Sequence, residues 1–170
     1  MRIVDGGLDD ARVGAMLELH VVRARAETAL GSAHALDLSG LRATDVSFWS
    51  AWEGEELVGV GALKRLSAEH GEIKSMHTAE AARGRGVGSA LVRHIVHQAR
   101  ERGMRRLSLE TGSWPYFLPA RALYARHGFV ECGPFGDYRE DSNSVFMTMG
   151  LEVPAADAFS APAGTPRSAD

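Results

Sequence analysis

Three glycines alternate with larger residues in the stretch Arg83-Gly84-Arg85-Gly86-Val87-Gly88. A strand-like segment, residues 72–77, precedes this stretch, and a helical stripe of apolar residues follows it from Leu91 to Ala99. Glycines leave the backbone N–H groups of such a turn uncovered, and the start of a helix adds the positive end of its dipole, so that together they bind anions. Arg83 and Arg85 add forked donors that suit phosphate. The stretch therefore predicts a site for a phosphorylated cofactor, and a pyrophosphate group is the ligand that fits it best.

Two other phosphate-binding loops do not fit this spacing. A P-loop requires the pattern GxxxxGK[ST], and no lysine follows these glycines. The dinucleotide fingerprint GxGxxG would begin with Gly84 and Gly86 and would need a third glycine where Ser89 stands. One alternative stays open at this point, namely a glycine-rich helix start that only carries solvated arginines.

The segments on either side of the turn predict a mixed set of strands and helices. Upstream we expect a strand at residues 2–4, a helix that begins after Asp9 or Asp10, a loop or short helix at residues 31–45, and a hairpin of strands at residues 48–52 and 57–63. Downstream we expect a strand at residues 106–110, a short helix at residues 120–127, and a last strand at residues 145–149. This order predicts an α+β, or mixed α/β, domain built on one sheet.

The composition is that of one globular domain. The chain has 170 residues, of which 45% are hydrophobic and 24% charged, and this balance predicts a soluble, folded protein. A net charge of −3 gives no overall field that would attract nucleic acid. Cys132 is the single cysteine, so an internal disulfide is excluded, and the histidines show no zinc-ligand spacing. The N-terminus lacks the apolar core of a signal peptide and no apolar run is long enough to span a bilayer, so we expect a cytoplasmic protein with no membrane partner.

Two segments together resemble a known family. Arg83, Gly86 and Gly88 match [RQ]-x-x-G-x-[GA], the coenzyme A pyrophosphate motif of the GCN5-related N-acetyltransferase (GNAT) superfamily, and residues 122–129 resemble its later LYxxxGF segment. Residues 108–113, 119–121 and 134–148 also resemble a bacterial subgroup typified by YsnE-like acetyltransferases. The resemblance covers residues 1–151 and implies a GNAT domain with a single central, mostly antiparallel sheet flanked by helices. We expect residues 152–170, rich in Ala, Pro and Ser, to form a disordered tail.

The resemblance also implies the cosubstrate, which is acetyl-CoA without a metal. By position in the motif, the cofactor-binding residues would be Met76, His77, Thr78, Arg83, Gly84, Arg85, Gly86, Val87, Gly88 and Ser89. In the family, main-chain N–H groups at the end of the strand before the motif hold the thioester carbonyl and the pantetheine arm. An asparagine often follows the next strand in the family; here Ser113 is a weak substitute.

Three residues are candidates for catalysis. The resemblance places a glutamate base at Glu72, on the strand before the motif, and a tyrosine acid at Tyr124. Glu110 is a competing base, because it shares one face of its strand with Ser108 and its neighbours Leu107 and Leu109 take the other. The alternatives also stay open: Glu72 as a surface partner of Lys74, and Tyr124 as a packing residue. His20 lies on the apolar stripe of the first helix and is interpreted as a core or rim histidine.

The function that these residues favour is N-acetylation. An amine with a pKa of about 10.4 is protonated at neutral pH, so direct attack on acetyl-CoA requires a base, and the departing thiolate is helped by an acid. The acceptor we expect is a primary amine on a small molecule, contacted by residues 24–45 and 134–143. A non-catalytic coenzyme A sensor and an enzyme that uses a longer acyl-CoA are the alternatives. The sheet edges and the last strand also offer a surface for a homodimer.

Overall fold

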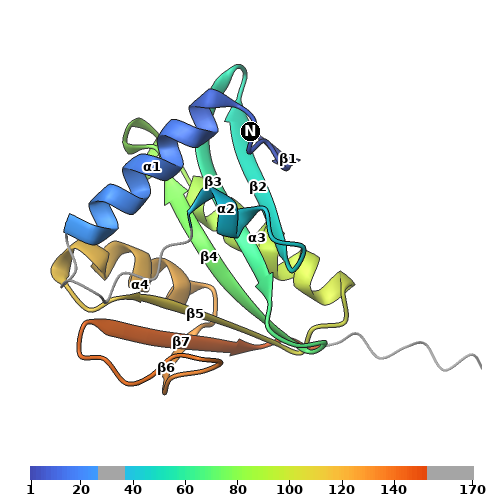
Figure 1. Cartoon of the computed structure of the whole chain (residues 1–170), viewed down its shortest axis with the longest axis vertical. Helices are drawn as coiled ribbons and strands as arrows, with labels where there is room; N and C mark the ends of the chain where they lie inside the picture. The colour runs from blue at the N-terminus through green and yellow to red at the C-terminus, as the bar shows by residue number, and fades with distance from the viewer. Residues whose placement is uncertain (27–36, 153–170) are drawn as a thin grey trace, which may run out of the picture.

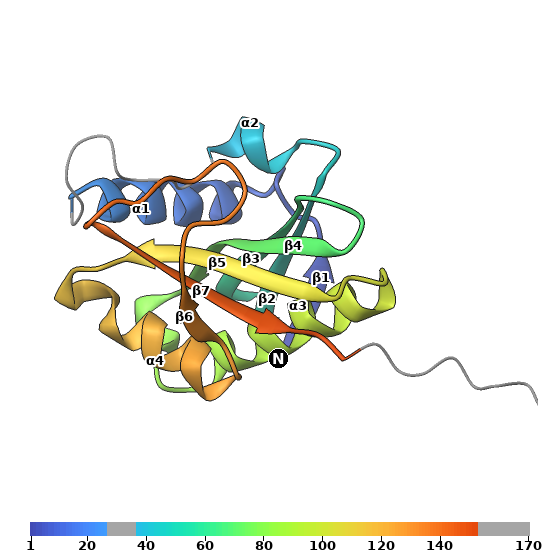
Figure 2. The ribbon, with the colours of Figure 1, turned by 90° about the horizontal axis from the view of Figure 1, so that it is seen from below.

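A computed structural model describes residues 1–26 and 37–152 of the chain. Its strands are β1 (Arg2–Asp5), β2 (Val46–Glu53), β3 (Glu56–Arg65), β4 (His70–Thr78), β5 (Arg106–Gly112), β6 (Val130–Cys132) and β7 (Ser144–Gly150). Its helices are α1 (Ala11–Ala26), α2 (Leu38–Leu41), α3 (Val87–Glu101) and α4 (Leu118–Arg126), with single 3₁₀ turns at η1 (Glu80–Ala82) and η2 (Pro115–Phe117). Figures 1 and 2 show α1 and α2 on one face of the sheet and α3 and α4 on the other.

The seven strands form one sheet in the order β1-β2-β3-β4-β5-β7-β6. Every neighbouring pair is antiparallel except β4 and β5, which are parallel. These two strands pair only from His70 and Arg106 to Ile73 and Leu109. Beyond that point β4 continues to Thr78 and β5 to Gly112, and Figure 1 shows them spread apart. The sheet is therefore open between two strands that begin side by side.

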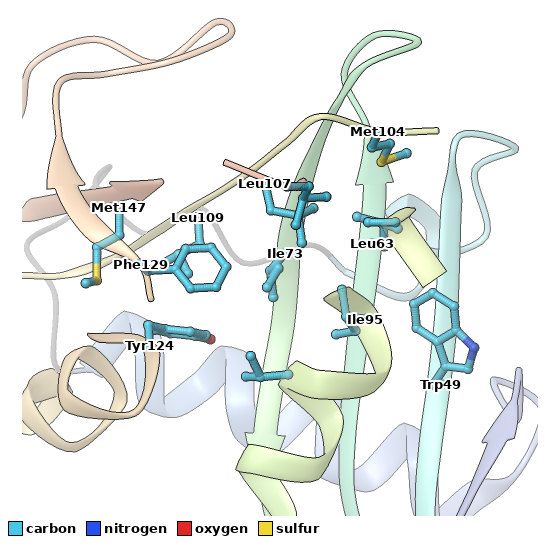
Figure 3. Packing of buried hydrophobic residues seen from close by; sticks show 13 residues of the cluster. Trp49, Leu63, Ile73, Ile95, Met104, Leu107, Leu109, Tyr124, Phe129 and Met147 are labelled. Carbon is cyan, nitrogen blue, oxygen red and sulfur yellow. The ribbon is translucent and has the colours of Figure 1, made fainter. Parts of the chain in front are cut away.

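Each face of the sheet carries its own core. On the α3 face, Leu91, Val92, Ile95 and Ala99 follow helical spacing and are completely buried against the sheet. Figure 3 shows Ile95 among Leu63, Trp49 and Ile73 on this face. On the other face, Val13 and Leu17 of α1 pack with a second cluster of Leu41, Phe48, Trp52, Leu57, Val60 and Ala62. Each large apolar side chain buried in this way contributes about 1.5–3 kcal/mol, so both helices are held firmly on the sheet.

The α+β class, the single sheet and its mostly antiparallel pairing are confirmed. The predicted hairpin, the strands on either side of the glycine turn, the short helix near its end and the last strand all occur close to their expected bounds. The sequence did not predict β6, because its three residues are largely exposed and carry no alternation of apolar and polar side chains. Of the loop or short helix expected at residues 31–45, residues 31–36 lie outside the described residues and the rest contains the short helix α2. Nearly all of the tail expected at residues 152–170 also lies outside the described residues. Among the described residues, no helix has the length and apolarity to cross a membrane.

Candidate active site

The space between the spread ends of β4 and β5 forms a cavity of about 520 Å³, which we call the first cavity. Its walls include His20 of α1 and Tyr124 of α4, which lie on opposite faces of the sheet. The first residues of α3, from Gly86 to Ser89, also line it. The cavity therefore passes through the sheet, and one bound molecule can touch groups on both faces.

The glycine turn begins α3 at the wall of this cavity. Gly84 and Gly86 adopt φ angles of 75° and 83°, which residues with a side chain rarely adopt. Gly86 is the N-cap of α3, and no side chain of the described chain caps it. The first N–H groups of a helix have no partner inside the helix, so those of Val87, Gly88 and Ser89 remain for a ligand. Together with the helix dipole, they provide the donor set that a diphosphate requires.

The two arginines of the motif point to different surroundings. Arg83 lines the first cavity. Arg85 instead forms an ion pair with Glu53 and does not belong to the cavity wall. Ser89 lines the wall, and its hydroxyl lies 3.0 Å from Nε2 of His127. A diphosphate in the first cavity would therefore meet the main chain of the turn and Arg83, but not Arg85.

An irregularity in β4 faces the same cavity. Val60 pairs with His77 and Ala62 with Lys74, so that Ser75 and Met76 together stand opposite the single residue between Val60 and Ala62, which is Gly61. Ser75 has a φ angle of 51°, the one positive value outside glycine in the described chain. This bulge turns the strand out of the regular ladder, and Met76, His77 and Thr78 all line the first cavity.

Tyr124 presents its hydroxyl to the first cavity. Its side chain is only 6% exposed and packs edge-on against Phe129, with ring centroids 5.8 Å apart. Figure 3 shows its oxygen directed away from α4. Burial raises the pKa of this phenol well above its usual value of 10. The hydroxyl is therefore protonated at neutral pH and can donate.

The structure separates the two candidate bases. Glu110 lines the first cavity together with Tyr124, and its Oε1 accepts a hydrogen bond from the Ser144 hydroxyl at 2.8 Å. Glu72 is 3% exposed, and its Oε1 accepts from Nζ of Lys74 at 3.0 Å and from the hydroxyl of Tyr138 at 2.5 Å. The carboxylate of Glu72 thus has charged and polar partners already, and it lies outside the first cavity.

Glu72 instead lines a second cavity, of about 690 Å³, on the α1 face of the sheet. Its floor is made by β3 and β4, and its other wall is the β6–β7 connection, residues 135–142. Figure 2 shows this connection crossing from β6 to the side of the sheet where α1 and α2 lie. Lys74 lines both cavities, so the two are neighbours.

Two histidines that the sequence did not assign to catalysis also meet in the first cavity. The rings of His20 and His77 lie 5.1 Å apart, and both residues line the wall. Burial, followed by the nearby His20 and two arginines, lowers the pKa of His77 from 6.5 to about 4. Burial also lowers the pKa of His20. Both rings are therefore neutral at pH 7, and the position of His20 on the apolar stripe of α1 was the signal for its burial.

Ser113 lies apart from these groups. Its hydroxyl donates to the carbonyl oxygen of Ser142 at 2.8 Å, and it does not line the first cavity. The sequence did not single out Lys74 or Leu123 for the site; both are wall residues whose position depends on how distant strands and helices meet. Within residues 1–26 and 37–152, no group of three or more His, Cys, Asp and Glu side chains could hold a metal ion.

Comparison with known proteins identifies the family. The model of the acetyltransferase (GNAT) family matches residues 16–129. The chain belongs to this family. It is 56% identical over 120 residues to YsnE of Bacillus subtilis, an uncharacterized N-acetyltransferase, covering 71% of this chain and 80% of that protein. It is 47% identical over 139 residues to YedL of Escherichia coli, also an uncharacterized N-acetyltransferase, covering 82% and 87%.

A solved structure from Klebsiella pneumoniae, assigned to the acyl-CoA N-acyltransferases, has the same fold. It superimposes with a TM-score of 0.73 at 28% identity, covering 89% of this chain and 97% of its own. These comparisons confirm the resemblance drawn from the glycine motif and the later helix. The protein is an N-acetyltransferase of the GNAT family.

Proposed function

We propose that this GNAT protein transfers an acetyl group from acetyl-CoA directly to the primary amine of a small molecule, with Glu110 as base and Tyr124 as acid. One observation carries the proposal: a carboxylate and a protonated phenol, from opposite faces of the sheet, line the cavity into which the N-terminus of α3 opens. Acetyl-CoA supplies the activated thioester carbonyl when it is bound. A cytoplasmic location and a homodimer remain predictions of the sequence.

The residues present fit coenzyme A. The uncapped first turn of α3 and the Arg83 guanidinium suit its diphosphate. The bulged end of β4, at Met76, His77 and Thr78, would hold the arm and the thioester with main-chain N–H groups, which act as preorganised donors for a developing oxyanion. Arg85 and Ser113 have other partners and are not needed in this arrangement.

Glu110 suits the role of base better than Glu72. An amine must lose a proton before it attacks a thioester, and the group that accepts this proton must lie within reach of the amine. Glu110 lines the reaction cavity and is oriented by Ser144. Glu72 lies outside this cavity, and its Oε1 already accepts from the Lys74 ammonium and from the Tyr138 hydroxyl. Tyr124 would donate its phenol proton to the departing thiolate and would then be reprotonated from solvent. Its raised pKa keeps the phenol protonated until that step.

A thiol-release assay with acetyl-CoA and a panel of amines tests the proposal. We expect release that depends on the amine, and a loss of about 100-fold or more in kcat for Tyr124→Phe. Acetyl, propionyl and succinyl donors compared in the same assay identify the acyl group. Thermal stabilisation by coenzyme A without thiol release from any amine would instead establish the alternative, a non-catalytic coenzyme A sensor.

A further inference from the structure

The chain contains only two lysines among its 19 basic residues, Lys64 and Lys74. Both line the second cavity. Lys64 stands on β3 directly opposite Glu72 of β4, and Lys74 lies two residues further along the same face of β4. Two compact ammonium groups therefore project from the sheet into one pocket, in a chain that otherwise uses arginine.

The two lysines differ in their partners. Lys74 is 9% exposed, and it donates to Oε1 of Glu72 at 3.0 Å and to the Tyr138 hydroxyl at 2.8 Å. Its charge is thus compensated by Glu72. Lys64 is half-buried, and its ammonium has no ion pair or hydrogen bond within residues 1–26 and 37–152. A partly desolvated cation without a partner favours binding of an anion, so the floor of the second cavity is a site for a carboxylate.

Apart from Glu72, which is paired with Lys74, the acidic residues of this cavity belong to the β6–β7 connection. Asp137 and Glu140, on the β6–β7 connection, are exposed to solvent. Asp141 is used within the connection, because its Oδ1 accepts from the main-chain N–H and the side-chain amide of Asn143. The strand floor, with two lysines and one glutamate, therefore carries a net positive charge, whereas the charges of Asp137 and Glu140 face water, where they are screened.

The remaining wall is apolar and aromatic. Phe135 and Tyr138 have ring centroids 5.1 Å apart, and Phe135 also packs on Phe146 at 5.9 Å. Leu66 adds an aliphatic surface. A ligand that places a carboxylate at Lys64 can therefore lay an apolar side chain against these rings.

The second cavity leads toward the reaction centre. Lys74 lines it and also lines the first cavity, where Glu110 lies. A molecule bound at Lys64 therefore lies next to the cavity that Glu110 lines. We propose that the acceptor is a small amine that also bears a carboxylate, as a free α-amino acid with an apolar side chain does, and that Lys64 binds this carboxylate. This inference rests on the proposed function and adds the class of acceptor to it.

Matched acceptors test the inference. Phenylalanine, phenylalaninamide and 2-phenylethylamine share an aromatic group and a primary amine, and only the first bears a carboxylate. Thiol release with acetyl-CoA should give phenylalanine a kcat/KM about 10- to 100-fold above those of the other two. Including 1,4-diaminobutane tests the opposite possibility, in which the rim carboxylates of Asp137 and Glu140 select a second ammonium group.

Variants then assign the preference to one side chain. Lys64→Met should raise the KM for phenylalanine about 10-fold or more while leaving the KM for acetyl-CoA and the rates with 2-phenylethylamine unchanged. Lys64→Arg should retain much of the preference. Arg65→Met is the control. Arg65 is the next residue on β3, is exposed and lies outside the cavity, so this substitution removes the same charge without changing the cavity.

The outcomes separate this inference from the proposed function. Equal kcat/KM for phenylalanine and its amide, a preference for 1,4-diaminobutane, or an equal effect of Lys64→Met on all acceptors would overturn the carboxylate site. The wild-type comparison decides the first two even if the Lys64 variants fold poorly. Absence of thiol release with every amine would contradict the proposed function itself.

Discussion

The two cavities of this protein are built from different parts of the chain. The first is lined by main-chain donors at the start of α3 and along the bulge of β4, over a single stretch from Ile73 to Ser89, and α4 and β5 complete it. The second is lined by side chains of β3 and β4 and by a connection more than 60 residues later. Main-chain donors recognise a group common to many acyl donors, whereas side chains recognise a particular acceptor. If the proposed function is correct, the two substrates of one enzyme are bound by different means.

The buried carboxylate of Glu72 and the half-buried carboxylate of Glu110 provide the sharpest test of this division. Glu110→Gln removes the proposed base of the first cavity and should lower kcat about 100- to 10,000-fold with little change in the free energy of unfolding. Amine acetylation at saturating acetyl-CoA measures the rate, and urea unfolding measures the stability. A Glu110→Gln enzyme with normal kcat would return the role of base to Glu72.

Glu72→Gln should have the reverse profile. It leaves the Lys74 ammonium buried without its counter-charge, so we expect the free energy of unfolding to fall by about 3 kcal/mol while kcat changes less than for Glu110→Gln. The double variant Glu72→Gln, Lys74→Met should regain part of this stability in urea unfolding, since it removes the uncompensated charge. Unchanged stability in Glu72→Gln would show that the pair is not buried in solution.

His77, in the first cavity, should make stability depend on pH. Its pKa of about 4 in the folded state lies below the ordinary 6.5, so the unfolded chain takes up the proton first as the pH falls. The contribution of neutral His77 to the free energy of unfolding is complete above about pH 6.5 and is lost as the pH falls toward 4. The neighbouring His20, Arg23 and Arg83 help to keep the pKa of His77 low. Between pH 7 and pH 5 the wild type should lose about 1–2 kcal/mol more stability than His77→Gln. His97→Gln, at an exposed position of α3, should lose as much as the wild type.

Substitution of the two arginines of the motif, Arg83 and Arg85, should give the smallest effects, and their difference in the KM for acetyl-CoA distinguishes the two residues. Arg83→Ala should raise the KM for acetyl-CoA about 10-fold, because it removes a charged donor from the first cavity. Arg85→Ala removes only a surface ion pair with Glu53 and should change that KM less than about threefold. Initial rates at varied acetyl-CoA measure both. An equal effect of the two variants would mean that Arg85 exchanges Glu53 for the cofactor.

Local patterns predicted much of the fold and of the cofactor end of the site. The apolar stripe from Leu91 to Ala99 predicted α3, because the spacing of apolar residues along a helix can be read from the local sequence. The turn of alternating glycines predicted an anion site because positive φ angles and an uncapped helix start are properties of a short stretch. Tyr124 was placed by the resemblance, and the structure adds that its phenol is buried and faces the first cavity.

Other features depended on contacts between distant segments. The sequence made Glu72 the first candidate for the base and Glu110 its competitor, and only the separation of β4 from β5 after Ile73 shows which carboxylate shares a cavity with Tyr124. The sequence already offered the ion pair of Glu72 with Lys74 as an alternative. It did not predict that Tyr138 contacts this pair, because Tyr138 lies 66 residues after Glu72 in the chain.

The sequence alone pointed to an acyl-CoA donor. The glycine turn, its arginines and the helix that follows are contiguous in the chain, so a short stretch of sequence is enough to recognise them. Tertiary structure decided which carboxylate lines the first cavity and which lysine of the second cavity forms no ion pair with another described residue. These answers depend on where β4 and β5 part and on where the β6–β7 connection crosses the sheet. Strand separation and loop placement follow from long-range packing on both faces, which no short stretch of residues specifies.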